Sequence, residues 1–211
     1  MDQRLVAADA ALKAGRRREG VDLIVAVLTE SPDQTVQVYR ALVLQFFQGG
    51  LFAEGEPWSA KAVAKFPRDF QLWNLRGVFL RRLGRHDEAL AALDQAIRLD
   101  PKDPSAQSNK GNIYNDLKDG PRAEAIFTRL LRQFPRNAEF QRALGRALRD
   151  QGKQDQAAVR FRQAVSLKKD YLDAWLDLSA MEAMRSRVDD SLAVVEQGLT
   201  NLPLNPKLLE A

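Results

Sequence analysis

The sequence contains no cysteine and only one histidine among its 211 residues. Without a thiol the chain can form no disulfide, no thiolate zinc site and no cysteine nucleophile. The histidine, His86, lies beside Gly84-Arg85, a pair typical of a turn, so we expect a solvated residue and not a catalytic base. These shortages predict that the chain is not an enzyme by itself and holds no metal or other cofactor.

Long apolar runs are also missing. The most apolar stretch, 21–28, is short and includes Asp22, whereas a membrane helix needs about 20 apolar residues. No apolar segment follows a basic start at the N-terminus, as it would in a signal peptide. We therefore expect no membrane partner and a cytoplasmic location.

Charge of one sign dominates two neighbouring segments, although the whole chain carries only +4. Residues 122–169 hold 12 basic and 4 acidic side chains, and residues 170–211 hold 3 basic and 8 acidic side chains. A basic segment can steer acidic partners toward the protein, but ordinary solvated helix surface explains the same pattern. Nucleic acid is not an expected partner, because no basic stripe alternates with exposed aromatic residues.

Proline is scarce but regularly placed. Four prolines follow one another at intervals of 35, 34 and 34 residues, at Pro32, Pro67, Pro101 and Pro135. Pro203 comes 68 residues later, which is two periods of 34, and Lys169 takes the skipped position. Each proline follows an apolar run with helical spacing, where the ring would end a helix. The spacing therefore predicts an internal repeat of 34 residues.

Other positions repeat with the same period. Large side chains share one column, at Tyr39, Trp73 and Trp175. Small residues share another, at Gly77, Gly111 and Gly145, with Ala8 and Ser179 as substitutes. Glycines mark a turn in the middle of most repeats, at Gly15, Gly50, Gly84 and Gly152, whereas Lys118 takes this place in the fourth. Large and small residues at fixed offsets indicate two closely packed helices in each repeat.

The unit 70–103 carries the full pattern of large, small, glycine, alanine, alanine and proline positions. This pattern resembles the tetratricopeptide repeat family, and it recurs about six times. We expect a single array over 1–211, with units near 1–35, 36–69, 70–103, 104–137, 138–171 and 172–205. The periods predict an all-α solenoid of helix-turn-helix repeats. The resemblance implies a right-handed superhelix whose first helices line a concave groove and whose second helices lie outside.

The last residues, 206–211, follow Asn205 and are expected to begin a further helix, because Asn and Pro start helices well. The chain is therefore expected to be a fragment of a longer protein. The preceding helix would leave Leu192, Val195 and Leu199 without a cover. This apolar set predicts self-association through the C-terminal end if nothing else covers it.

Three groups of first-helix residues are expected to face the groove. The first two units offer Leu5, Leu44 and Phe47, with Phe46 expected to be buried and Phe47 partly exposed. The middle units offer Asn74, Arg81, Asn109, Asn112 and Asn115, and the fifth offers Arg142, Arg146 and Arg149. Spacings of three and four residues place the members of a trio on one stripe of a helix. Ordinary solvation of an open face is the alternative interpretation.

The chemistry of these side chains favours a peptide ligand. Asparagine amides both donate and accept hydrogen bonds, so they can hold the backbone of an extended segment. Arginines bind carboxylates in a bidentate manner, which favours an acidic segment or a C-terminal carboxylate. We therefore expect a protein–protein interaction scaffold. The alternative is a substrate-recruiting domain of a longer multidomain enzyme, such as a transferase.

Two binding devices known from the tetratricopeptide family are not expected here. The chaperone clamp that holds a C-terminal carboxylate would use Asn112, but its neighbouring units offer Ala143, Asp173 and Asp177. The asparagine ladder of the family's glycosyltransferases would use Asn109, but Leu75 and Ala143 occupy the neighbouring positions of that column.

Overall fold

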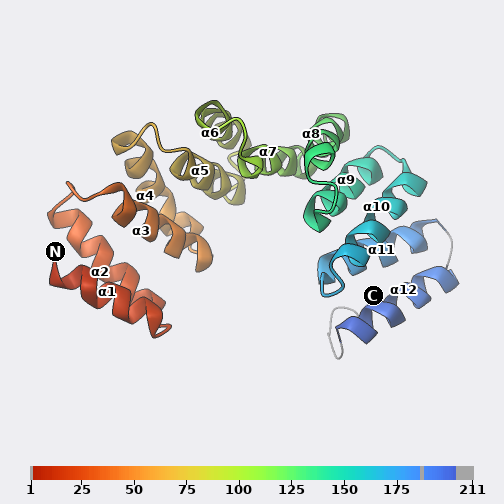
Figure 1. Cartoon of the computed structure of the whole chain (residues 1–211), viewed down its shortest axis with the longest axis horizontal. Coiled ribbons are helices and arrows are strands. Elements are labelled where there is room, and N and C mark those ends of the chain that lie inside the picture. Colours follow the sequence, from red (N-terminus) through yellow and green to blue (C-terminus); the bar gives the residue numbers. More distant parts are fainter. Residues whose placement is uncertain (1, 186–187, 203–211) are drawn as a thin grey trace. The chain divides into compact units, whose positions relative to one another are not determined.

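The computed structural model describes residues 2–185 and 188–202, and the predicted helix at 206–211 lies outside them. Twelve α-helices and no strand make up this described part, which confirms the all-α prediction. The first six are α1 (Gln3–Lys13), α2 (Arg17–Glu30), α3 (Val36–Gln48), α4 (Phe52–Lys65), α5 (Phe70–Arg82) and α6 (His86–Leu99). The others are α7 (Pro104–Asp116), α8 (Gly120–Gln133), α9 (Ala138–Asp150), α10 (Gln154–Leu167), α11 (Leu172–Met184) and α12 (Val188–Asn201). Successive helices pair as hairpins of a solenoid (Figure 1).

The chain divides into two compact units, Met1–Asn109 and Lys110–Ala211, which are called unit 1 and unit 2 below. Helix α7 runs across the boundary, so only its first turns belong to unit 1. A single array over 1–211 remains a prediction.

The turns within the hairpins follow the glycine column. Four glycines adopt positive φ angles of 69–77°, at Gly15, Gly50, Gly84 and Gly152. This left-handed conformation costs a glycine little, because it has no Cβ to clash with the backbone. Lys118 adopts the same conformation, with φ of 56°, at the place where the fourth repeat has no glycine. The sequence pattern therefore identified the turns, and a lysine accepts the strained backbone at one of them.

The proline column and the column of large side chains are joined by hydrogen bonds. Tyr39 Oη donates to the Pro32 carbonyl at 2.9 Å, and Trp73 Nε1 donates to the Pro67 carbonyl at 2.9 Å. The same bond ends on Lys169, which stands in the skipped proline position and accepts from Trp175 Nε1 at 2.8 Å. In the two remaining repeats glutamines make it, Gln107 to Pro101 and Gln141 to Pro135. Each first helix is thereby fastened to the loop before it.

The column of small residues allows the two helices of a hairpin to approach each other. A Cβ atom on Gly77 would lie 2.5 Å from Leu93, and one on Gly145 would lie 2.5 Å from the Phe161 ring. Leu93 and Phe161 are both fully buried. A side chain in this column would therefore force apart well-packed core residues.

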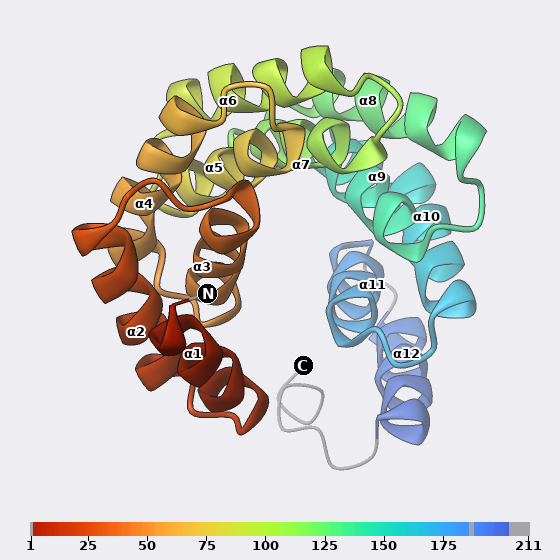
Figure 2. The same ribbon diagram turned by 60° about the vertical axis from the view of Figure 1, so that its left-hand side comes forward.

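The first helices of successive hairpins lie against one another within each unit. Contacts join α3 with α5 in unit 1 and α9 with α11 in unit 2. Among the described residues, no comparable contact joins α2 with α4, α4 with α6, or α10 with α12. In each unit the first helices therefore form one continuous surface, the first-helix face, and the second helices form the opposite outer face (Figure 2).

Candidate functional site

The first-helix face of unit 1 contains a cleft of about 330 Å³. It is lined by Arg40 and Leu44 from α3, by Phe70, Gln71, Asn74 and Leu75 from α5, and by Asp103 and Ser105 around the start of α7. Leu44 is 40 % exposed, which is unusual for a leucine and leaves apolar surface at the cleft. The cleft therefore combines an apolar wall with groups that donate and accept hydrogen bonds.

A chain of hydrogen bonds runs across this cleft. Asn109 Nδ2 donates to Asn74 Oδ1 at 2.9 Å, and Asn74 Nδ2 donates to Ser105 Oγ at 3.1 Å. The Ser105 backbone N–H donates to Asp103 Oδ1 at 2.8 Å. Two of the asparagines that the sequence analysis selected, Asn74 and Asn109, are thus brought together on adjacent helices. Each amide keeps a second N–H and a second carbonyl lone pair for another partner.

Arg40 is a cleft residue that the sequence analysis missed. Its Nε donates to Asp69 Oδ2 at 2.8 Å, and the Asp69 carboxylate also accepts from the Leu72 backbone N–H at 3.0 Å as the N-cap of α5. The Asp69 side chain is only 6 % exposed, whereas that of Arg40 is 39 % exposed. The pair therefore fixes α3 to the start of α5 and leaves part of the guanidinium at the surface.

The other selected residues of unit 1 lie near this cleft or in the core. Phe46 is buried and Phe47 is partly exposed with its ring edge against Phe52, which confirms the expectation for this pair. Leu5 packs as a partly buried residue against the core of unit 1. Arg81 is partly buried near the end of α5.

The three arginines of α9 all make ion pairs on the first-helix face of unit 2. Arg142 Nε lies 2.6 Å from Asp177 Oδ2, and Arg142 Nη1 lies 3.1 Å from Asp173 Oδ2. Arg149 Nη1 lies 3.1 Å from Asp177 Oδ1, and Arg146 Nη2 lies 3.5 Å from Asp116 Oδ1. The basic stripe expected from the sequence is present, but carboxylates of the same unit already lie against it.

Asp177 is the centre of this cluster, because both of its carboxylate oxygens bind an arginine and its side chain is only 15 % exposed. Burial lowers the pKa of Arg142, but the Asp177 charge and the hydrogen bonds to Tyr171 and Asp177 outweigh it and raise the pKa. The Arg142 guanidinium also lies 5.5 Å from the centroid of the Tyr171 ring. The cluster therefore holds its arginines in a fixed, charge-compensated arrangement.

Asn115 differs from its expected position. It is 2 % exposed, and its Nδ2 donates to the Ala143 carbonyl at 3.0 Å. It therefore joins α7 to α9 in the interior of unit 2 and does not face a groove. Asn112, on the same helix, is partly exposed.

The two clusters follow one spacing rule. Asn74 bonds to Ser105 and Asn109, which lie 31 and 35 residues further along the chain. Arg142 pairs with Asp173 and Asp177, which also lie 31 and 35 residues further along. Asn74 and Arg142 occupy the same position of the 34-residue period, two repeats apart. A side chain at this position thus reaches two residues, one turn apart, on the next first helix.

Other kinds of site were sought in the same part of the chain. Among the described residues, no group of three or more histidine, cysteine, aspartate or glutamate side chains is placed to hold a metal ion. In the described helices, none is long and apolar enough to cross a membrane. His86 is the first residue of α6 and is partly exposed. Leu192, on α12, is 59 % exposed, and self-association through this end remains a prediction.

Relatives among characterised proteins match the chain only as a part of their own length. Protein O-mannosyl-transferase TMTC1 of Homo sapiens is 24 % identical over 196 residues, which is 93 % of this chain and 19 % of that protein. Hsp70-Hsp90 organizing protein 3 of Arabidopsis thaliana is 27 % identical over 95 residues, or 45 % of this chain and 17 % of that protein. The chain thus spans less than a fifth of the length of these relatives.

Solved structures share the fold over almost the whole chain. A tetratricopeptide repeat protein from Parabacteroides merdae superposes with a TM-score of 0.81 at 14 % identity, covering 95 % of this chain and 79 % of that one. PilW, described as a widely conserved type IV pilus biogenesis factor, gives a TM-score of 0.82 at 20 % identity, covering 99 % and 96 %.

Family profiles match the sequence over the same repeats. One tetratricopeptide repeat profile matches residues 80–147, and a second matches residues 42–104 and 142–206. The second profile alone covers more than half of the chain. With the helical hairpins and the 34-residue columns, this places the chain in the tetratricopeptide repeat family of protein-interaction scaffolds.

Proposed function

We propose that the chain binds an extended polypeptide segment along its first-helix faces and has no catalytic activity of its own. The hydrogen-bonded row of Asn109, Asn74 and Ser105 beside the exposed Leu44 carries this proposal. The amides are held in place by one another, so little rotamer entropy is lost when they bind a peptide backbone. Leu44 supplies apolar surface for a side chain of the segment.

We further propose that the segment is acidic or ends in a carboxylate, and that it meets the arginine cluster of unit 2. A guanidinium has five N–H donors, so Arg142 and Arg149 can share a ligand carboxylate with Asp177 or exchange one carboxylate for the other. Asp177 then acts as an internal competitor for the ligand. This feature limits the affinity of acidic segments and disfavours segments that lack a carboxylate.

A second candidate function is supported by the coverage of the transferase relative. The chain matches a stretch equal to 19 % of Protein O-mannosyl-transferase TMTC1 with 93 % of its own length. In a longer enzyme of this kind, the repeats would recruit a substrate polypeptide with the same first-helix faces. Both proposals therefore place ligand binding at the same residues, and they differ in whether a catalytic domain is attached.

Leu44→Glu should weaken binding of extended peptides at least tenfold, which corresponds to about 1.4 kcal/mol. The reason is that a charge replaces the exposed apolar wall of the cleft. Peptides would be selected from a random library on the immobilised chain, synthesised, and measured by fluorescence anisotropy. Lys61→Glu, an exposed change on the outer helix α4, is the control. If both variants bind the selected peptides as the wild type does, the cleft is not the binding site.

Asp177→Asn should strengthen the binding of an acidic peptide several-fold, because it removes the internal competitor of Arg142 and Arg149 and keeps the size of the side chain. The measurement is the same anisotropy titration with a selected acidic peptide and with its version in which amides replace the carboxylates. Only the acidic version should gain affinity. Weaker binding of the acidic peptide by Asp177→Asn would show that Asp177 positions the arginines and does not compete.

A further inference from the structure

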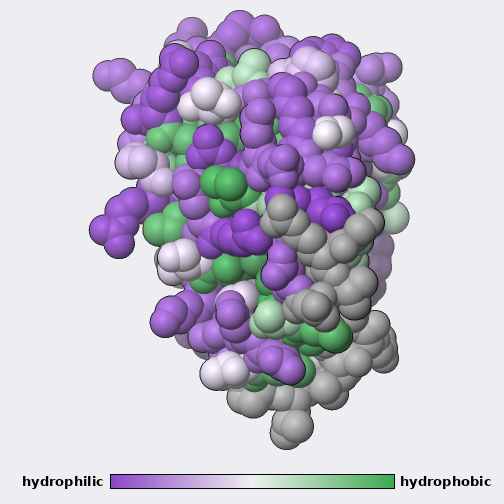
Figure 3. All heavy atoms as spheres, turned by 90° about the vertical axis from the view of Figure 1, so that its right-hand side faces the viewer, coloured by the Kyte–Doolittle hydropathy of each residue, from purple (hydrophilic) through white to green (hydrophobic). Residues whose placement is uncertain are grey.

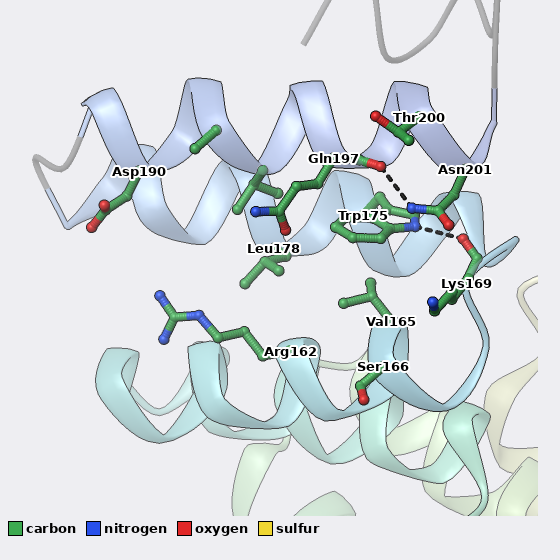
Figure 4. Close-up of a pocket in the computed structure, with 12 residues that line it drawn as sticks. Arg162, Val165, Ser166, Lys169, Trp175, Leu178, Asp190, Gln197, Thr200 and Asn201 are labelled. Carbon is green, nitrogen blue, oxygen red and sulfur yellow. Dashed lines mark hydrogen bonds between the residues drawn. The ribbon is translucent and has the colours of Figure 1, made fainter.

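The outer face of unit 2 carries two clefts separated by α10. One cleft, of about 570 Å³, lies between α10 and α12 and has the buried Trp175, Leu178 and Val194 among its lining residues. Figure 4 shows the Trp175 ring inside this cleft, between α10 and α12. The other, of about 460 Å³, lies on the opposite side of α10 and is lined partly by Val159 and Leu167.

A single ridge of α10 joins these clefts, because Arg162 and Ser166 line both of them. Val159 is 49 % exposed and Leu167 is 36 % exposed, so the second cleft offers apolar side chains directly to solvent. The space-filling view of this end of the chain shows a largely hydrophilic surface interrupted by small hydrophobic patches (Figure 3). The surface therefore suits a partner that inserts apolar side chains between polar contacts.

The charge around the ridge is positive. Residues 122–169 hold 12 basic and 4 acidic side chains, and the three arginines of α9 are matched by carboxylates on the first-helix face. The excess therefore lies on and around the outer helices, where Arg132, Arg136, Lys168 and Lys169 are exposed. Lys169 lines one end of the α10–α12 cleft, opposite the end that holds Asp190 (Figure 4).

We propose that this outer face is a second binding site, for an acidic polypeptide segment that carries bulky apolar side chains. The apolar side chains enter the two clefts on either side of the Arg162–Ser166 ridge, and the carboxylates meet the surrounding lysines and arginines. Charge complementarity selects this partner. A nucleic acid would require exposed aromatic rings for its bases, and the clefts offer Val159 and Leu167 at their surface. A lipid surface requires protruding apolar groups, whereas Trp175 and Leu178 are recessed.

The site is independent of the peptide groove, because it uses second helices and the opposite face of the unit. One chain could therefore hold two polypeptides at once, one on each face. This arrangement would make the protein a bridge between partners and not only a receptor for one of them.

The probe is a short synthetic peptide of glutamate and leucine with its leucines on one helical face, titrated by fluorescence anisotropy into the full chain. The combined variant Val159→Glu and Lys169→Glu should weaken its binding tenfold or more, since both an apolar contact and a charge are lost. Both residues are exposed, so the fold should survive, and circular dichroism checks this. The control Val6→Glu with Lys61→Glu makes the same changes at exposed positions of unit 1 and should bind as the wild type does.

Two comparisons complete the test. A lysine–leucine peptide and a glutamate–alanine peptide should both bind at least tenfold more weakly than the glutamate–leucine probe, because the first has the wrong charge and the second has no bulky apolar groups. The proposal is overturned if these peptides bind equally well, or if both paired variants lose the same affinity. Tighter binding of single-stranded DNA or of anionic vesicles through Val159 and Lys169 would also overturn it, as would self-association through this face that excludes the probe.

Discussion

Glu182→Ala should lower the free energy of unfolding of the C-terminal hairpins by about 3–5 kcal/mol, because it removes one partner of a buried ion pair. Glu182 is fully buried on α11. It accepts hydrogen bonds from Arg162 Nη2 at 2.5 Å and from Arg185 Nη1 at 2.9 Å. The Arg185 side chain is only 10 % exposed, so the variant leaves a largely buried cation with Asp155 as its remaining partner in the described structure.

Urea unfolding followed by circular dichroism measures the loss, and hydrogen exchange locates it in α10, α11 and α12. The matched control replaces both partners, Glu182→Met with Arg185→Met, and should stay close to the wild type, since apolar residues of similar size often replace a buried ion pair without loss. A loss below about 1 kcal/mol for Glu182→Ala would mean that water reaches this cluster and compensates its charges.

Phe79→Ala should destabilise unit 1 by about 3–5 kcal/mol, as other truncations of fully buried aromatic residues do. Phe79 is completely buried, and its ring lies 5.7 Å from that of Phe52. It also fills the space beside Gly55, where a Cβ atom would lie 2.4 Å from the ring. The cavity left by alanine would therefore lie where α4 packs against α5, and the loss should spread to neighbouring hairpins, which depend on their shared interfaces.

Phe47→Ala is the matched control for this second prediction. Its ring also contacts Phe52, at 6.3 Å between centroids, but the residue is partly exposed. Urea unfolding should show a much smaller loss, about 1 kcal/mol, since less apolar area returns to water. Equal losses at the two positions would contradict the division into a buried and a groove-facing phenylalanine.

The hairpins could be predicted from the sequence because their signals are local. Proline excludes itself from a helix interior, and glycine adopts the left-handed turn, so both report the chain geometry at their own positions. Lys118 shows the limit of this argument, since its positive φ is imposed by the repeat and not by its own preference. The glutamine members of the column of large side chains were missed because hydrogen bonding, not size, defines that column.

The candidate site could be predicted only in part, because the sequence analysis treated each first helix separately. It located the arginine stripe correctly but not the carboxylates against it. Pairs separated by 31 and 35 residues contain this information, as the contacts of Asn74 and Arg142 show. The burial of Asn115 has no such signal, because it depends on a backbone carbonyl of the next helix.

Hydrogen exchange of the chain with and without a selected peptide tests the central claim most directly. The Val159→Glu and Lys169→Glu variant should be used, so that the outer clefts do not contribute. Binding at the first-helix faces predicts slower exchange in α3, α5, α9 and α11, with little change in α4, α6 and α10. Protection confined to α4, α6 and α10 would contradict the account, because the peptide would then lie on the second helices.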